Sequence, residues 1–280
     1  MANQIHTAGT EVSALVPEVW SERFQEVNRA NLPFIDSVSD DYQGEIQDMG
    51  DIVNISQIPD FDQADVLAEG AAGDAEAVTV TGTQLTINQR PYKDFIVEKR
   101  AQMQSVPFMD QLREHAVYSI MKKMQALIIS AIVPSASTPD HQIAYDSGTT
   151  LALADILEAK ELLMDADCPQ EDLTMVMDSA QWNDLYNITG FTSRDFVPAG
   201  SPLASGEFAT PILGFVPKFT SVAANVTYCF HRSFLTMAIQ KGMNVEEISM
   251  GADGVRGIRV NSDVLFGVVQ LDDQRVVSIS

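Results

Sequence analysis

The residue types that most often bind metals are few and widely spaced in this 280-residue sequence. Its four histidines are His6, His115, His141 and His231. No two of them stand at metal-ligand spacing, and neither a His-Glu-x-x-His nor a Cys-x-x-Cys motif occurs. The sequence therefore predicts no metal site and no metal cofactor.

Motifs for phosphate binding and nucleophilic catalysis are also absent. There is no Gly-x-x-x-x-Gly-Lys-Ser/Thr loop and no Gly-x-Ser-x-Gly elbow. Gly251, Gly254 and Gly257 recur at three-residue spacing but follow no strand–helix unit, which favours a turn between two strands. Cys168 and Cys229 are too few for a disulfide framework, and a reducing compartment is the simpler interpretation.

Carboxylates are the one abundant reactive group. Asp plus Glu number 39 against 17 Lys plus Arg, a net charge of -22. So many acids make chance pairs certain, and an acid–base pair has no diagnostic value without its geometry. Binding to a nucleic-acid duplex needs a cationic face, so this chain as a whole would repel nucleic acid and anionic lipid. We expect no catalytic residue, no cofactor and no sequence-specific DNA binding.

Export and membrane segments are not predicted. Residues 1–10 lack the basic and apolar regions of a signal peptide. The most apolar stretch, residues 124–133, is half of the roughly 20 residues that cross a bilayer. A hydrophobic content of 45% is ample for the core of one large domain or two smaller ones.

The most unusual region is residues 31–89, which contain 12 acidic residues and no Lys or Arg. Residues 51–58 and 78–87 are β-rich, and a further β-rich stretch covers 92–97. Residues 59–77 between the first two are rich in Ala, Gly, Asp and Glu. We interpret the first two as long antiparallel arms joined by a loose acidic tip. Such a hairpin is marginal alone, so we expect another copy of the chain to support it.

The helical patterns flank this region. Residues 12–30 predict a short amphipathic helix with Trp20 as its aromatic anchor. Residues 107–133 predict a helix about 40 Å long, capped by Ser105 and stopped by Pro134. Its expected buried stripe is Met109, Leu112, Ala116, Ile120, Met124, Leu127 and Ala131.

The second half mixes helices and strands. Residues 151–165 predict a helix with Leu153, Ile156, Leu157 and Leu163 on its inner face. Residues 173–177 predict a strand buried on both sides, followed by a helix to about residue 186 that Asp178 or Ser179 caps. Seven short β-like runs follow Pro211: 212–219, 226–230, 235–239, 245–249, 258–260, 264–270 and 276–279. The fold class is therefore α+β.

Several segments resemble tailed-bacteriophage major capsid proteins of the Hong Kong 97-type fold. They read Leu173-Thr-Met-Val-Met-Asp-Ser-Ala-Gln-Trp-Asn-Asp-Leu185, Ile212-Leu-Gly-Phe-Val-Pro217, Gly254-Val-Arg-Gly-Ile-Arg259, Phe266-Gly-Val-Val-Gln270 and Val276-Val-Ser-Ile279, together with residues 229–245. The order of elements matches over nearly the whole chain.

The resemblance implies four regions. Residues 1–42 would be an N-terminal arm with a short helix, and 43–99 the extended E-loop hairpin with its base. Residues 100–148 with 241–265 would form the P domain, including the long spine helix. Residues 149–240 with 266–280 would form the A domain.

The resemblance also implies a function. The chain would assemble through hexamers and pentamers into an icosahedral shell that encloses double-stranded DNA in the virion, after assembly in the host bacterial cytoplasm. The implied partners are a portal, a decoration protein and, because the chain starts with only a short arm, a separate scaffolding protein. The acidic hairpin has no lysine before Lys93, so we expect no lysine crosslink there. An encapsulin-like nanocompartment shell and an acidic α/β enzyme remain alternatives.

The charge pattern suggests how copies would meet. Seven of the 17 basic residues follow the acidic hairpin directly: Arg90, Lys93, Lys99, Arg100, Arg113, Lys122 and Lys123. We predict that the tip of one copy docks on this basic stretch of the next through its acids Asp60, Asp62, Asp65 and Glu69. Single exposed ion pairs contribute little, so the attraction would come from many charges together.

Overall fold

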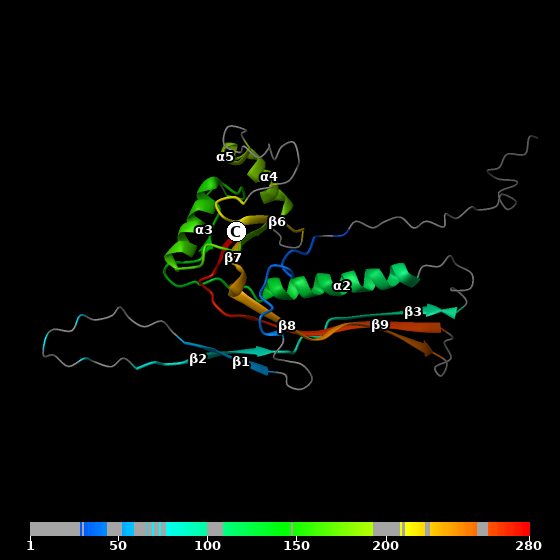
Figure 1. The fold of residues 1–280 in the computed structure, drawn as a ribbon. Helices are drawn as coiled ribbons and strands as arrows, with labels where there is room; N and C mark the ends of the chain where they lie inside the picture. Colours follow the sequence, from blue (N-terminus) through cyan, green and yellow to red (C-terminus); the bar gives the residue numbers. More distant parts are fainter. Residues whose placement is uncertain are drawn as a thin grey trace, which may run out of the picture.

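The computed structural model of the protein describes residues 29, 31–43, 52–58, 66, 69, 73, 77–99, 109–146, 148–192, 208, 211–221, 225–250 and 257–280. Within these residues the elements form three sheets, with helices packed against the two larger ones (Figure 1). The helix predicted over 12–30, with Trp20, lies outside the described residues except at Arg29.

A five-stranded sheet organises one end of the molecule. Its strand order is β4 (Gln142–Ile143), β10 (Val276–Ile279), β7 (Thr227–His231), β5 (Leu173–Met177) and β6 (Val216–Phe219). β5 pairs antiparallel with β7 and parallel with β6. Every residue of β5 is buried, which confirms the prediction, because cores lie on both faces of this sheet.

Two helices cover one face of this sheet. In α3 (Leu153–Asp165), Ile156 and Leu163 join the core formed with β5. Leu153 and Leu157, predicted to face inward, are exposed, because the helix turns Asp155 and Ala159 toward the core beside Ile156 and Leu163. In α4 (Ser179–Asn187) the Asp178 carboxylate accepts the Ser179 N–H and caps the helix as predicted. The short α5 (Thr189–Thr192) follows.

The other face of the five-stranded sheet shares a second core with the long helix α2 (Met109–Ser130). α2 also covers one face of a three-stranded sheet of order β3 (Tyr92–Glu98), β9 (Gly257–Gln270) and β8 (Leu235–Met250). The buried residues of the helix are Ala116, Ile120, Met124, Gln125 and Ile128. The predicted stripe is thus confirmed at three positions, while Ile128 was missed.

α2 ends three residues before the predicted residue 133. The Ala131 N–H bonds to the carbonyls of both Leu127 and Ile128, a tightened final turn. The Val133 N–H donates instead to the side-chain oxygen of Gln270, at 2.7 Å. Because Pro134 disfavours helical geometry at the residue before it, the helix stops early and its 22 residues span about 33 Å.

Four of the predicted short strands merge into two long ones. The runs 235–239 and 245–249 form one strand, β8, with irregular register between Ile239 and Asn244. The runs 258–260 and 264–270 form one strand, β9. Polar residues 261–263, which separate the two predicted runs, continue the strand, and Ser262 and Asp263 are buried within the sheet. The second register shift of β8, between Lys241 and Asn244, takes up Gly242 and Met243 without ending the strand.

The two predicted arms form the antiparallel hairpin of β1 (Ile52–Gln57) and β2 (Thr81–Thr86), which confirms that prediction. The base of the hairpin packs on the face of the three-stranded sheet opposite to α2. Its hairpin-base cluster consists of the buried residues Val53, Ile55, Leu85, Ile87 and Ala238. Residues 77–80, which precede β2 in the chain, extend away from all three sheets (Figure 1).

Candidate functional site

The root of the projecting hairpin is held by a close backbone contact. A Cβ atom on Gly267 of β9 would stand 2.5 Å from the carbonyl oxygen of Thr86 and 3.1 Å from the Cα of Ile87. Because both are backbone atoms, no side-chain movement could relieve the clash. Only glycine lets the end of β2 lie this close to β9, and the contact seats the hairpin-base cluster.

A buried carboxylate ties the linker between β2 and β3 to β9. The Asp263 side chain is 3% exposed, and its Oδ2 accepts hydrogen bonds from Arg90 Nε at 2.8 Å and pairs with Arg90 Nη2 at 2.6 Å. Its Oδ1 lies 3.4 Å from Lys241 Nζ, at the β8 bulge. The hydrogen bond from Arg90 outweighs burial and lowers the pKa of Asp263. The hairpin root is therefore braced by charge as well as by apolar packing.

This carboxylate should make the hairpin root sensitive to acid. Its lowered pKa means that its stabilisation is present above the ordinary aspartate range and is lost as the pH falls through its folded-state pKa. We expect Asp263→Asn to reduce the free energy of unfolding by about 1–2 kcal/mol at pH 7, because the partner cations are half-exposed. The difference from wild type should shrink below about pH 4. Thermal unfolding of both proteins from pH 7 to below about pH 4 measures this difference in stability.

The control for this experiment is Asp273→Asn, since Asp273 is exposed and its side chain has no partner among the described residues. This variant should unfold like wild type at every pH. A difference between Asp263→Asn and wild type that persists unchanged at pH 3 would contradict the assignment.

The structure divides the predicted basic stretch into paired and available cations. Arg90 is committed to Asp263 of its own chain, and Arg113 pairs with Asp110 and Glu247. Four lysines are exposed and make no ion pair with any described residue: Lys93, Lys99, Lys122 and Lys123. Within the described part of this stretch, these lysines are the cations without an ion pair.

The acidic half of the predicted contact is described only in part. Glu69 is exposed. Asp60, Asp62, Asp65 and the base residue Arg100 lie outside the described residues. The docking of tip on base therefore stays a prediction.

The described part of the hairpin beyond its base is apolar as well as exposed. Ile58 is 67% exposed, Val78 50% and Val80 57%. On the same side of the three-stranded sheet as the hairpin base, Tyr92, Ile96 and Ile248 are also exposed. Such side chains leave a large apolar area uncovered in a single copy, which is typical of a protein interface.

Sequence reasoning missed Asp263 as the partner of both Arg90 and Lys241. One signal was available, because a carboxylate directly before the apolar run 264–269 is unusual in a strand unless it is paired. It also missed the pair of Arg259 with Asp94, whose Nε–Oδ2 distance is 2.7 Å across β9 and β3. Arg259 and the hydrogen bond it donates lower the pKa of Asp94.

The described residues offer little for catalysis. They contain no group of three or more His, Cys, Asp or Glu placed to hold a metal ion. Both cysteines are free and buried, and burial raises the pKa of Cys229 to about 12. A cavity of about 560 Å³ is lined by aromatic, amide and hydroxyl side chains and Lys218, with no carboxylate among its described residues. No described helix is long and apolar enough to cross a bilayer.

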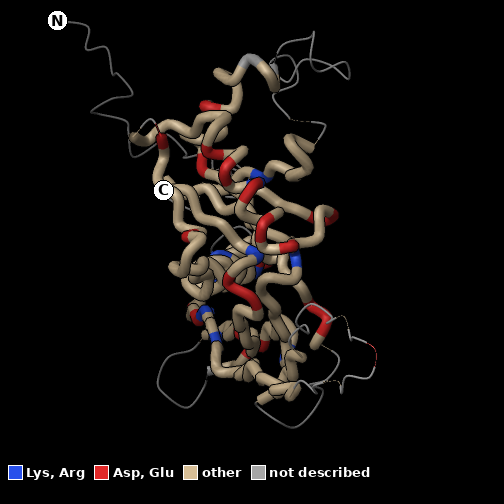
Figure 2. Tube along the Cα trace, turned by 90° about the vertical axis from the view of Figure 1, so that its left-hand side faces the viewer, with Lys and Arg blue, Asp and Glu red and all other residues tan. Residues whose placement is uncertain are grey.

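Acidic positions spread along the body in Figure 2, with fewer basic ones among them. This distribution follows from the net charge of -22.

The comparisons with known proteins concern nearly the whole chain. Residues 43–280 match the sequence model of a family described as phage capsid protein. No curated protein sequence matches the chain.

Solved structures share its fold at low sequence identity. A chain of Mycobacterium phage Che8 is 21% identical, with a TM-score of 0.79 over 95% of this chain and 97% of that one. A chain of the cyanophage Pam1 capsid is 14% identical, with a TM-score of 0.77 over 100% and 98%. A chain of the cyanophage P-SCSP1u capsid is also 14% identical, with a TM-score of 0.77 over 97% and 94%.

Proposed function

This chain belongs to the phage capsid protein family, and from that premise we propose that it is the major shell subunit, assembling through hexamers and pentamers into an icosahedral capsid. The shell would enclose double-stranded DNA in the virion. The observation that carries this proposal is the projecting hairpin, which is anchored firmly at its root and exposes apolar side chains beyond it.

The hairpin supports assembly because one copy of the chain leaves it uncovered. Its root is fixed by the hairpin-base cluster, by the contact at Gly267 and by the Asp263 ion pairs. A firm root directs the exposed Ile58, Val78 and Val80 toward a neighbouring subunit. Obligate interfaces bury on the order of 2,000 Å² or more of surface. A projecting segment adds to the buried area because it lies along a neighbouring subunit, so the globular part of the chain need not be larger.

Electrostatic attraction would guide the same contact. The tip of one copy carries Asp60, Asp62, Asp65 and Glu69, while Lys93, Lys99, Lys122 and Lys123 of the next have no ion pair within the described part of their own chain. Arg90 would act indirectly, by positioning the root. Opposite charges of this kind mainly accelerate encounter and select register.

The regions implied by the sequence form the second part of the proposal. α2 would serve as the spine helix of a P domain (100–148 with 241–265), and the five-stranded sheet with α3 and α4 would lie in an A domain (149–240 with 266–280). β8 and β9 run across both boundaries without interruption. The two domains would therefore move together more readily than domains joined by flexible linkers.

The remaining partners follow from the role of a shell. We propose a separate scaffolding protein during assembly in the host cytoplasm, a portal at one vertex and a decoration protein on the outside. The role is structural rather than enzymatic. A net negative subunit suits a container, because an anionic inner wall would not hold the packaged DNA.

Negative-stain microscopy of the full-length chain tests the proposal. We expect closed particles tens of nanometres across, or capsomers that close when a scaffolding protein is supplied. Particles that package a co-expressed cargo protein instead of DNA would support a nanocompartment. A small oligomer of fixed size by light scattering, with and without scaffold, would contradict a shell-forming role.

A further inference from the structure

Two chain segments connect the five-stranded sheet to the three-stranded sheet, and they lie side by side. The first runs from β7 through the 3-10 turn η3 (Arg232–Phe234) into β8. The second runs from β9 through residues 271–275 into β10. Any change in the angle between the two sheets must therefore bend both connections.

Backbone hydrogen bonds join these connections directly. The His231 N–H donates to the Arg275 carbonyl at 3.1 Å. The N–H groups of Leu271 and Asp272 both donate to the Phe234 carbonyl, at 2.8 and 3.2 Å. Phe234 is completely buried, so these bonds are anchored in the core that α2 shares with both sheets.

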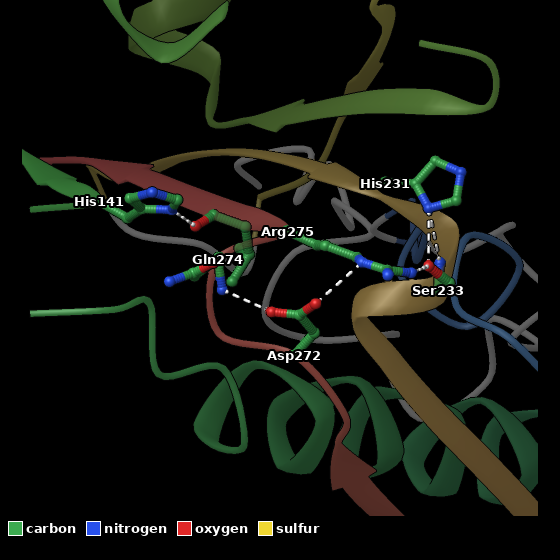
Figure 3. Close-up of polar contacts among 7 residues, drawn as sticks. His141, His231, Ser233, Asp272, Gln274 and Arg275 are labelled. Carbon is green, nitrogen blue, oxygen red and sulfur yellow. Dashed lines mark hydrogen bonds and ion pairs between the residues drawn. The ribbon is translucent and has the colours of Figure 1, made fainter. Parts of the chain in front are cut away.

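A row of side chains also joins the two connections (Figure 3). Asp272 Oδ2 pairs with Arg275 Nε at 2.9 Å, and its Oδ1 accepts the Gln274 N–H. Arg275 Nη1 donates to Ser233 Oγ at 2.7 Å, and Ser233 Oγ lies 2.8 Å from His231 Nδ1. We name the row Asp272–Arg275–Ser233–His231 the inter-sheet brace.

The hydrogen atoms of the brace can be assigned from its donors. Arg275 can only donate, so Ser233 Oγ accepts from it and keeps its own hydrogen available to donate to His231 Nδ1. The Ser233 N–H points to the same nitrogen, at 3.3 Å. Nδ1 must therefore carry a lone pair, and His231 is neutral with its proton on Nε2. A proton on Nδ1 would remove the acceptor of both Ser233 groups.

We propose that the inter-sheet brace is a proton-sensitive joint, in which protonation of His231 releases η3 and loosens the angle between the two sheets. The proposal goes beyond the shell role and holds whether or not the chain assembles. The joint would let the two halves of the subunit change their relative tilt without breaking either sheet.

The surroundings of His231 set the sign of the pH dependence. Burial and the positive charge of Arg275 lower the pKa of His231, against a smaller opposing effect of Asp172, which precedes the neighbouring strand β5. The adjacent Arg232 pairs with Asp40 of the 31–43 segment, and Asp272 is occupied by Arg275. The unfolded chain thus binds the proton more readily than the folded chain. The brace is therefore intact at neutral pH and weakens as the pH falls below the pKa of an ordinary histidine.

Hydrogen–deuterium exchange of the full-length protein tests the joint. After correction for the intrinsic effect of pH, amides in 231–236 and 271–276 should exchange about tenfold faster at pH 5 than at pH 7.5. Amides of β5 should keep their protection. His231→Asn preserves an acceptor near the Nδ1 position but cannot be protonated, so its protection should be the same at both pH values. Ser233→Ala should raise exchange in both segments at pH 7.5.

Two matched controls identify the titrating residue. His141 also lies beside this connection, with Nδ1 3.2 Å from the Val276 carbonyl (Figure 3), whereas His115 is exposed on α2. His141→Asn and His115→Asn should both retain the wild-type response to pH. Equal protection of the wild-type segments at both pH values, or a pH response that survives in His231→Asn, would overturn the proposal. The wild-type comparison requires no substitution, and neither outcome depends on particle formation.

Discussion

Replacing Gly267 by alanine is expected to detach the root of the hairpin. The added Cβ would meet the Thr86 carbonyl oxygen at 2.5 Å, and the strand carrying it is held on both sides by β3 and β8. Overpacking against rigid backbone costs about 1–3 kcal/mol. We expect the melting temperature to fall by about 2–5 °C, with faster amide exchange in β2 and fewer closed particles.

Gly242→Ala provides the matched control. Gly242 lies at the β8 bulge, and nothing stands within 4 Å of the position its Cβ would take. We expect its melting temperature to equal that of wild type or to rise slightly, because alanine restricts the unfolded chain. If Gly267→Ala unfolds and assembles like Gly242→Ala, the close contact does not hold the hairpin.

Reversing the charge of the acidic tip should prevent shell formation. The variant carries Asp60→Lys, Asp62→Lys, Asp65→Lys and Glu69→Lys, and it would set four cations against the free lysines of the neighbouring copy. Like charges across an interface oppose both encounter and docking. We expect soluble, folded subunits and no particles by negative-stain microscopy and light scattering.

Two further variants test whether assembly depends on a local contact of the tip or on the net charge of the whole chain. Four acids on or near α3 are exposed, namely Glu158, Glu161, Asp165 and Glu171, and their replacement by lysine changes the net charge equally. This control should still assemble. Combining the reversed tip with Lys93→Glu and Lys99→Glu should restore particles in part. Normal shells from the reversed tip alone would end the docking hypothesis.

Local patterns were reliable wherever burial follows the period of one element. β5 is buried on both faces, Asp178 caps α4, and the two arms pair antiparallel, as predicted. The inner face of α3 was partly wrong at Leu153 and Leu157, since their exposure depends on how the helix is rotated against the sheet. Polar residues 261–263 concealed the continuity of β9, because the burial of Asp263 depends on its ion pairs with Arg90 and Lys241, which come from other segments.

The sequence by itself determined the order and type of the elements, the acidic hairpin without a single cation, and the resemblance to capsid proteins. These properties depend on composition and on side chains that repeat along one element. Only the tertiary structure decided that Arg90 pairs with Asp263, 173 residues away, that Gly267 touches Thr86, and that His231 and Arg275 join two connections. Such contacts depend on strand register and on the packing of one sheet against another, which no local period encodes.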